Sequence, residues 1–329
     1  MKRGFLNNTK ARAKISGGDS EAPKKKTESG STSGPSYYKA KYGVVEHAGL
    51  PEGYKLADLD VKELDPHRDP RTLPENLFLV TSLPIPLEAP AAAGTDRATA
   101  CMLQSTTKAQ ILSTPGFPRP VPRPPAVRHR IGPAPGMDLG AFSTARIQRG
   151  EVILSERALL IAPGHLFGDD DYPSSFSEAQ IQQAILVQAE QYLKVAFDRM
   201  DPEDKTAYMA LANSHLQDGS GPILGIMRTN GVGAGPLTRP GTPPMPYSAV
   251  CKEISRLNHS CCPNTTALFD MPSFSFRLFA LRDIASGEEL TYPYIDVTAP
   301  AAERQKALEP YGFRCTCPAC RDPTSDARR

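Results

Sequence analysis

Three cysteines lie within six residues near the end of this 329-residue chain, where the segment 315–320 reads CTCPAC. Three thiols so closely spaced cannot easily all pair with one another, but a Cys-x-x-Cys segment bends naturally around a metal ion. Tetrahedral Zn²⁺ takes four soft ligands, so this CxCxxC pattern needs one more ligand from elsewhere in the chain. The spacing therefore predicts a structural zinc site at Cys315, Cys317 and Cys320, with free or redox-active thiols as the alternative.

A second cluster, RLNHSCCPN at 256–264, places an amide and an imidazole beside two adjacent cysteines. The candidates for the fourth metal ligand are Cys251, His259, Cys261 and Cys262. The cysteine count of seven is odd, and the first residues, MKRGFLNNTK, have no apolar signal-peptide region. We therefore expect a reducing compartment, where clustered cysteines favour metal ligands over disulfides.

The formal charge of the chain is nearly balanced, with 38 Lys and Arg against 36 Asp and Glu and a net charge of +2. This balance does not suggest a duplex-DNA binder that works mainly by charge, and no basic and aromatic platform for nucleic acid is visible. No apolar run is long enough to span a membrane. We expect a monomer of the nucleus and/or cytoplasm with no direct sequence-specific nucleic-acid binding and no membrane contact.

The first part of the chain has the composition of poorly packed sequence. Residues 1–36 are basic and then rich in Gly, Ser, Lys and Thr, which predicts a disordered tail. Residues 37–127 hold many of the 33 prolines, which predicts a weakly ordered region or a strap on a neighbouring domain. Within it, NLFLVTSLPIPL (76–87) favours a strand and ATACMLQSTTKAQIL (98–112) a short helix.

The character of the sequence changes near residue 128, where β-prone apolar pairs alternate with glycines. The pattern predicts short strands followed by two helices. Ser177–Gln180 reads SEAQ, a capping box that opens a helix to about 200. Asp201 and Pro202 are typical of an N-cap and first helical residue, and open a second helix to about 213. The predicted strands lie at 128–132, 139–145 and 151–161.

A second strand-rich block follows a Gly/Pro loop at 219–246. Phe274, Phe276 and Leu278 alternate with polar residues, which predicts a half-buried strand. ASGEELTYPYID (285–296) adds a turn and a strand, and Thr298 is expected to cap a last helix before the polar tail at 323–329. The ordered part is therefore expected to be a β-rich α+β domain rather than an alternating βαβ sheet.

Four segments, in this order and at this spacing, resemble a SET domain with its post-SET zinc segment. They are GMDLGAFSTARIQRGEVI (136–153), RLNHSCCPN (256–264), GEELTYPYID (287–296) and FRCTCPAC (313–320). The helical insertion at about 163–245, with DPEDKTAYMALANSH and RTNG, resembles fungal SET proteins related to the SMYD class. It lacks the cysteines of a MYND finger.

The resemblance implies a fold of small β-sheets around a knot-like crossing, in which the NHSC and ELTxxY segments lie side by side. It places the SET domain at 128–297 and the post-SET helix and zinc segment at 298–322. It implies S-adenosylmethionine-dependent methyl transfer to a lysine of a histone or non-histone protein. The alternative is a zinc-stabilised interaction module on a SET scaffold with weak or no activity.

The resemblance also implies roles for single residues. Tyr294, the final Tyr of ELTxxY, is the implied catalytic residue, and Cys261 is the implied fourth zinc ligand. Tyr292 is the implied product-specificity residue, and its hydroxyl favours mono- or dimethylation. The implied cofactor-binding residues are Gly140, Asn230, Ser255, Leu257, Asn258, His259 and Phe313.

One position departs from the pattern of that family. Asp138 stands where the first glycine of a GxG motif is expected, while Gly140 is kept. Glycine tolerates a positive φ and allows close backbone approach, and Asp adopts left-handed angles more easily than most residues. We therefore expect Asp138 to weaken cofactor binding rather than abolish it, and its charge to be able to meet the cofactor's amino group.

Overall fold

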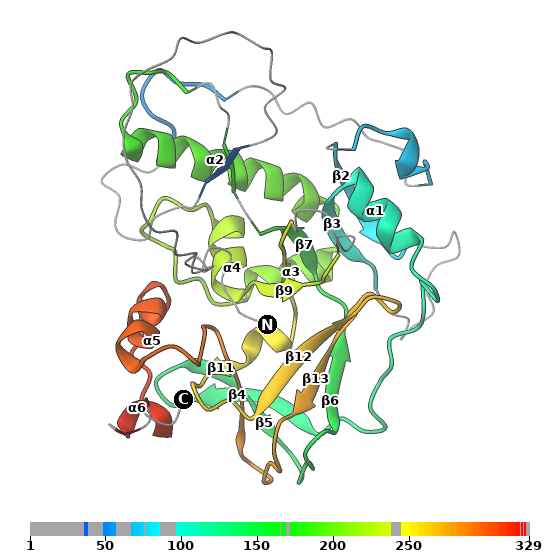
Figure 1. Cartoon of the computed structure of the whole chain (residues 1–329), viewed down its shortest axis with the longest axis vertical. Coiled ribbons are helices and arrows are strands. Elements are labelled where there is room, and N and C mark those ends of the chain that lie inside the picture. The colour runs from blue at the N-terminus through cyan, green and yellow to red at the C-terminus, as the bar shows by residue number, and fades with distance from the viewer. Residues whose placement is uncertain are drawn as a thin grey trace, which may run out of the picture.

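The computed structural model describes residues 36–38, 49–56, 67–75, 77–85, 97–164, 166–168, 172–237, 245–322, 324 and 326. In that part of the chain, six α-helices surround several small β-sheets, so the predicted α+β class is confirmed (Figure 1). The predicted tails at 1–36 and 323–329 lie almost entirely outside the described residues.

Four sheets organise the strands. The largest has the order β2 (Phe78–Leu83), β3 (Thr99–Gln104), β7 (Leu160–Pro163), β10 (Tyr247–Val250), β9 (Val232–Ala234). The second has the order β11 (Asn258–His259), β14 (Glu289–Tyr292), β5 (Asp138–Ser143), β4 (His129–Ala134). The third has the order β12 (Thr265–Asp270), β13 (Ser275–Ala280), β6 (Val152–Glu156), and the fourth pairs β1 (Ser36–Tyr38) with β8 (Leu166–Gly168).

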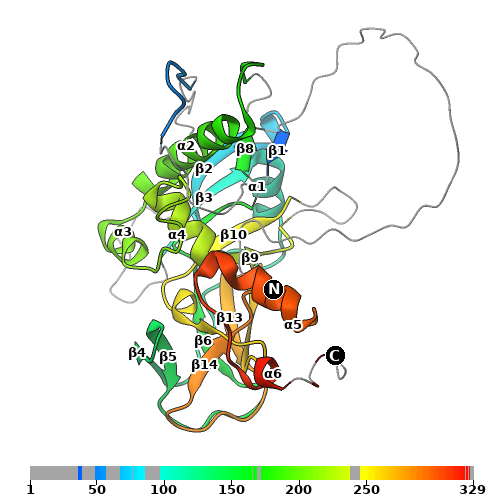
Figure 2. The same cartoon turned by 90° about the vertical axis from the view of Figure 1, so that its left-hand side faces the viewer.

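The α-helices gather at two places. They are α1 (Ser105–Leu112), α2 (Glu178–Asp198), α3 (Pro202–Met209), α4 (Pro222–Asn230), α5 (Ala301–Leu308) and α6 (Pro318–Arg321). Short 3₁₀ turns lie at η1 (Pro70–Thr72), η2 (Ile254–Arg256) and η3 (Glu309–Tyr311). Helices α1 to α4 lie around the five-stranded sheet, and α5 and α6 lie beside the smaller sheets at the other end of the molecule (Figure 2).

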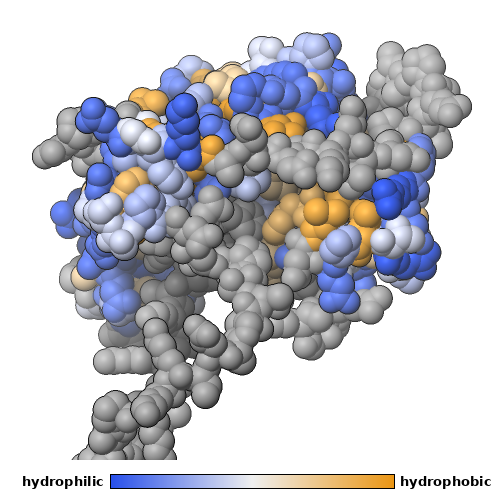
Figure 3. All heavy atoms as spheres, turned by 90° about the horizontal axis from the view of Figure 1, so that it is seen from above, coloured by the Kyte–Doolittle hydropathy of each residue, from blue (hydrophilic) through white to orange (hydrophobic). Residues whose placement is uncertain are grey.

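Helix α2 packs on the five-stranded sheet through one apolar side. Its predicted capping box is present: Ser177 accepts from the backbone of Gln180, whose side chain accepts from the Ser177 N–H. Ile185, Ala189 and Leu193 are buried on its inner side, as the periodicity predicts. Seen from above, the surface at this end of the molecule mixes hydrophilic side chains with hydrophobic ones, which include one contiguous patch (Figure 3).

The predicted boundaries were wrong in four places. The segment 98–112 is half strand (β3) and half helix (α1), because its apolar first half pairs with β2 and β7. The segment 151–161 forms two strands in different sheets, β6 and β7. Helix α5 begins after Pro300, and Thr298 instead bonds to Asp296. The second predicted helix ends earlier than expected, at Met209.

A crossing of two distant segments lies at one edge of the four-stranded sheet. Strands β11 and β14 pair in parallel, with Asn258 opposite Thr291 and His259 opposite Tyr292. The NHSC and ELTxxY segments therefore lie side by side, as the resemblance implied.

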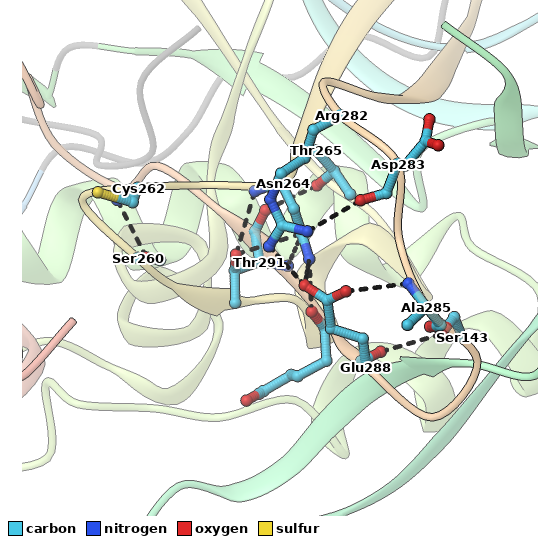
Figure 4. Close-up of polar contacts among 11 residues, drawn as sticks. Ser143, Ser260, Cys262, Asn264, Thr265, Arg282, Asp283, Ala285, Glu288 and Thr291 are labelled. Carbon is cyan, nitrogen blue, oxygen red and sulfur yellow. Dashed lines mark hydrogen bonds and ion pairs between the residues drawn. The ribbon is translucent and has the colours of Figure 1, made fainter. Parts of the chain in front are cut away.

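Asn264, at the end of RLNHSCCPN, holds the two segments of this crossing together by hydrogen bonds (Figure 4). Its side-chain amide donates to the Glu289 carbonyl at 2.8 Å, and its side-chain oxygen accepts from the Thr291 N–H at 2.7 Å. The neighbouring Thr265 hydroxyl donates to the Thr291 carbonyl at 2.8 Å. One amide thus satisfies backbone groups of β14 that would otherwise be buried without partners.

Candidate functional site

Four cysteines converge beside the crossing. The sulfurs of Cys261, Cys315, Cys317 and Cys320 all lie within 4.8 Å of one another. Cys261 Sγ lies 3.9 Å from Cys315 Sγ and 3.5 Å from Cys320 Sγ. Four sulfurs around one Zn²⁺ at about 2.3 Å would stand about 3.8 Å apart, so this group could hold a metal ion.

One of the four candidates for the remaining ligand, Cys261, lies in this group. By contrast, Cys262 is exposed and Cys251 is buried elsewhere. The hydrogen bond between the sulfurs of Cys261 and Cys315 raises the pKa of Cys261 and lowers the pKa of Cys315 to about 2. Without a metal, negative charge therefore concentrates on Cys315, and a bound metal ion would stabilise the other sulfurs as thiolates too.

A fully buried arginine lies against this cluster. Arg304 of α5 is 0% exposed, and its Nη2 lies 3.9 Å from Cys320 Sγ and 3.4 Å from the Ala319 carbonyl. Its Nη1 donates to the Ala299 carbonyl at 2.6 Å and pairs with Asp326 at 3.1 Å. A buried cation needs nearby negative charge, which Asp326 supplies and a thiolate at Cys320 would increase.

A pocket of about 440 Å³ lies close to the cluster, between the crossing and the helical insertion. Its lining comes from distant parts of the sequence: the turn before β5, α4, the RLNHSCCPN segment and the residues after α5. Five of the predicted site residues line it: Asn230, Ser255, Asn258, Tyr294 and Phe313.

Tyr294 is held at the pocket by its own hydroxyl. The hydroxyl donates to the Leu257 carbonyl at 2.7 Å, and the side chain is 8% exposed. Its ring centroid lies 5.0 Å from that of Tyr311 and 6.5 Å from that of Phe313. Because the Tyr294 hydroxyl donates its proton to Leu257, its oxygen is left to accept a hydrogen bond from a ligand in the pocket.

His259 links this tyrosine to the cysteine cluster. Its Nδ1 accepts from the Tyr294 backbone N–H at 3.0 Å, and its Nε2 lies 3.3 Å from Cys261 Sγ. Since Nδ1 is the acceptor, the ring proton sits on Nε2 and points to the sulfur. His259 does not line the pocket; it lies behind Tyr294.

Asn258 and Gly140 meet at the same point of the sheet. The Asn258 amide donates to Glu289 Oε1 at 2.8 Å and to the Leu139 carbonyl at 3.1 Å. A Cβ on Gly140 would stand 2.8 Å from Glu289 Oε1 and 3.0 Å from Asn258 Nδ2. Gly140 therefore provides the space for this pair, and any side chain there would displace it.

Comparison with known proteins decides the family. The SET domain sequence profile matches residues 138–295, which span both strands of the crossing and Tyr294. The chain contains a SET domain.

Relatives of this SET domain are fungal, plant and animal. The chain is 27% identical over 193 residues to Schizosaccharomyces pombe "Histone-lysine N-methyltransferase set5", covering 58% of this chain and 50% of that protein. It is 45% identical over 75 residues to human "Histone-lysine N-methyltransferase SMYD3", covering 22% of this chain and 17% of that protein. The chain thus spans half the length of the first relative and a sixth of the second.

Several lining residues of the SET pocket were not predicted. Tyr311 stands two residues before Phe313 in YGF, a spacing that could have signalled a second ring on the same side. Asn213 and Thr229 lie in the ALANSH and RTNG segments of the insertion. Arg256 had no distinguishing signal beyond its place in RLNHSCCPN.

The backbone of the glycine-rich turn confirms that Asp138 can adopt the left-handed angles expected at this position. Asp138 adopts φ +61° and Gly136, two residues earlier, φ +76°. Asp138 lines the pocket and is exposed to solvent. The chain therefore reaches the left-handed conformation at Asp138 without a glycine.

Three predicted residues besides His259 lie outside the pocket lining of the SET domain: Gly140, Leu257 and Tyr292. Leu257 is fully buried and acts through its carbonyl on Tyr294. Tyr292 is also fully buried, opposite His259 in the parallel pairing.

Glu156 positions the approach to the NHSC segment, and no motif predicted it. Its carboxylate accepts the backbone N–H groups of Lys252, Glu253 and Ile254, the last at 2.6 Å. Burial raises the pKa of Glu156 to about 7, against the opposing effect of these hydrogen bonds. These hydrogen bonds fix the backbone at the start of η2, which contains Ser255 and lies just before Asn258.

No helix in the described residues is long and apolar enough to cross a membrane.

Proposed function

We propose that this SET-domain protein is an S-adenosylmethionine-dependent protein-lysine N-methyltransferase. The observation that carries the proposal is the convergence of Asn258, Tyr294 and Phe313 on one pocket beside the β11–β14 crossing. The names of its relatives, which describe histone-lysine N-methyltransferases, point the same way. The substrate is a lysine of a histone or non-histone protein, and the site of action is the nucleus and/or cytoplasm.

The pocket suits a nucleoside with an amino-acid arm. Its volume of about 440 Å³ lies in the usual range for small-molecule sites. Phe313 and Tyr311 form an aromatic wall on which a flat base can stack. Asn230 anchors its amide nitrogen to the Ala212 and Ile226 carbonyls at 2.7 and 2.9 Å, so its amide oxygen is the group left for a ligand.

Residues outside the lining support this site rather than touch the cofactor in our proposal. Gly140 keeps space for the Asn258–Glu289 pair, Leu257 holds the Tyr294 hydroxyl, and His259 holds the Tyr294 backbone. Ser255 lines the pocket while its hydroxyl accepts from the Cys251 N–H at 3.1 Å.

S-adenosylmethionine supplies a sulfonium-bound methyl group, which a neutral lysine amine can accept by in-line displacement. Lysine has a free pKa near 10.4, so the protein must favour its neutral form. Buried aromatic surroundings disfavour the charged amine by desolvation, and positioning the amine lowers the barrier further. We assign Tyr294 to orienting the amine through its acceptor oxygen, not to removing its proton.

Zinc is the metal we propose for the four-cysteine group, in a structural role. Four thiolates with no open position for substrate fit a closed tetrahedral Zn²⁺ site. Such a site would join the RLNHSCCPN segment to residues 315–320, directly after Phe313, and so hold the aromatic wall over the pocket.

Tyr292 is our candidate for product specificity. It is fully buried on β14, two residues before Tyr294. A buried hydroxyl that shrinks the lysine channel favours mono- or dimethylation. Mass spectrometry of the product tests this, and a dominant trimethyl product would contradict it.

Isothermal titration of the full chain with S-adenosylmethionine tests the proposed function. We expect saturable binding that Asn258→Ala weakens about tenfold, since a buried hydrogen bond to a charged group contributes about 1.5–3 kcal/mol. Cys262→Ser, which changes an exposed side chain of the same segment, is the matched control and should bind as the wild type. No binding at millimolar cofactor would instead favour an inactive interaction module.

A further inference from the structure

A second groove, here called the β4 groove, has a volume of about 370 Å³ and shares only Arg256 with the proposed cofactor pocket. One wall is β4, and the other comes from α3 and the residues around the start of η2. Three consecutive residues of β4 line it: His129, Arg130 and Ile131. Successive side chains of a strand point to opposite faces of a sheet, so a groove that touches all three lies against the edge of β4.

Strand β4 is the outer strand of the four-stranded sheet, with β5 as its neighbour on one side (Figure 2). The Arg128 carbonyl accepts from the Thr144 N–H on that side at 2.9 Å. Backbone groups of an antiparallel strand turn to alternate sides, so Arg130 also bonds toward β5, whereas His129 and Ile131 turn theirs toward the groove. Such an open edge is a template for pairing with a strand of another chain.

Exposed apolar side chains flank this open edge. Val127 is 77% exposed and Ile131 is 36% exposed. Pro133, further along β4, has no N–H to donate, so full pairing with an added strand ends before it. The open edge therefore suits a short extended segment that carries apolar residues, because strand addition draws its affinity from main-chain hydrogen bonds and its specificity from alternate side chains.

Positive charge is in excess around the β4 groove. Arg130 and Lys252 are exposed and Arg256 is half-buried, and none of these three forms an ion pair with any described residue. Glu253 is the one acidic residue of the groove lining, and it is paired with His129. A partner that fits this surface therefore carries negative charge, since complementary charges steer association and disfavour wrong partners.

We infer that β4 docks an acidic, extended segment of a partner protein, which adds to the four-stranded sheet beyond β4. The backbone of that segment bonds with His129 and Ile131. Its carboxylates meet Arg130 and Lys252, and its apolar side chains cover Val127. A nucleic acid would satisfy the cations but leave the open backbone groups and the apolar side chains without partners. The inference is independent of the methyl transfer proposed above, because it does not involve the cofactor.

A peptide array tests the charge and the apolar character of the partner. The full chain is applied to every hexapeptide composed of Glu and Val alone, and to the matching set composed of Lys and Val. Mixed Glu/Val peptides should bind and Lys/Val peptides should not. The tightest binder is then measured by fluorescence anisotropy. Lys252→Glu and Arg130→Glu should each weaken it about fivefold. Lys306→Glu, the same charge change at an exposed position of α5, should bind it as the wild type does.

Backbone methylation of that peptide tests strand addition without changing the protein. N-methylation at alternate residues removes the N–H groups along one edge of an extended peptide. Of the two peptides methylated at odd or at even positions, one should lose about tenfold in affinity and the other should keep it. Equal affinity of both, no binding of the Glu/Val set, or equally tight binding of the Lys/Val set would overturn the inference. A single-stranded oligonucleotide that binds the wild type but not Lys252→Glu, while no peptide binds, would assign the groove to nucleic acid instead.

Discussion

The ring of His259 accepts a hydrogen bond from the backbone N–H of Tyr294 at 3.0 Å while its other nitrogen lies 3.3 Å from Cys261 Sγ. One side chain thus connects the four-cysteine cluster to the residue proposed to orient the substrate. Such partners fix the orientation of ligands and of the loops around them. Loss of either bond should therefore be felt at both sites.

Two substitutions separate the two bonds of His259. Asn at this position can imitate the Nδ1 acceptor but cannot reach Cys261, whereas Ala removes both contacts. We expect His259→Asn to speed zinc release while keeping most methyl transfer. His259→Ala should lose both, with a stability loss of about 1–2 kcal/mol. Zinc release to a colorimetric chelator and transfer of radiolabelled methyl groups measure the two effects; equal behaviour of the two variants would contradict the separation.

Removal of zinc should loosen two distant segments together. Chelation is expected to increase protease cleavage within 258–264 and within 312–322 in parallel, because the same ion would hold both. Cys261→Ser should lower the bound zinc, and Cys262→Ser, at the exposed neighbour, should not. Unchanged proteolysis after chelation would rule out a structural metal at this cluster.

Arg304 should retain the metal by neutralising thiolate charge. Arg304→Gln is expected to accelerate zinc release and to cost about 2 kcal/mol of stability, the range for hydrogen bonds to charged groups. Lys306→Gln removes the same charge from an exposed position of α5 and is the matched control. Arg304→Lys keeps the charge without the planar fork and should be intermediate. If Lys306→Gln releases zinc as fast as Arg304→Gln, the effect is not local.

Glu156 should make stability depend on pH in a defined direction. Its pKa in the folded protein is about 7, above its ordinary value near 4.5, so the folded state binds the proton more tightly than the unfolded state. The contribution of Glu156 to stability is therefore present below about pH 4.5 and declines as pH rises to 7. The melting temperature of the wild type minus that of Glu156→Gln should fall between pH 5 and pH 8. A difference that stays constant or rises would show that the carboxylate is stabilised by its backbone donors.

Local patterns predicted much of this fold and site. The CxCxxC spacing located three of the four clustered cysteines, SEAQ located the start of α2, and Asp138 was expected to tolerate a positive φ. Each of these depends on neighbours in the chain, which the sequence displays directly.

Long-range partners explain what could not be predicted. Glu156 acts through backbone groups 96 to 98 positions away, and no residue type marks a backbone donor. The segment 98–112 has no clear period, so its strand half was recognisable only once β2 and β7 flanked it. Arg256 and Arg304 look like ordinary surface arginines until the fold brings each to a site.

Methyl transfer by Tyr294→Phe tests the central claim most directly. The substitution removes one hydroxyl, and Tyr172→Phe, which removes a hydroxyl that contacts Gln188 on α2, is the matched control. With tritiated S-adenosylmethionine and a lysine-containing protein library, the wild type and Tyr172→Phe should label protein. Tyr294→Phe should bind the cofactor normally yet label about a hundredfold less. Labelling by Tyr294→Phe at the wild-type rate, or cofactor binding by the wild type with no labelling of any lysine, would contradict the account.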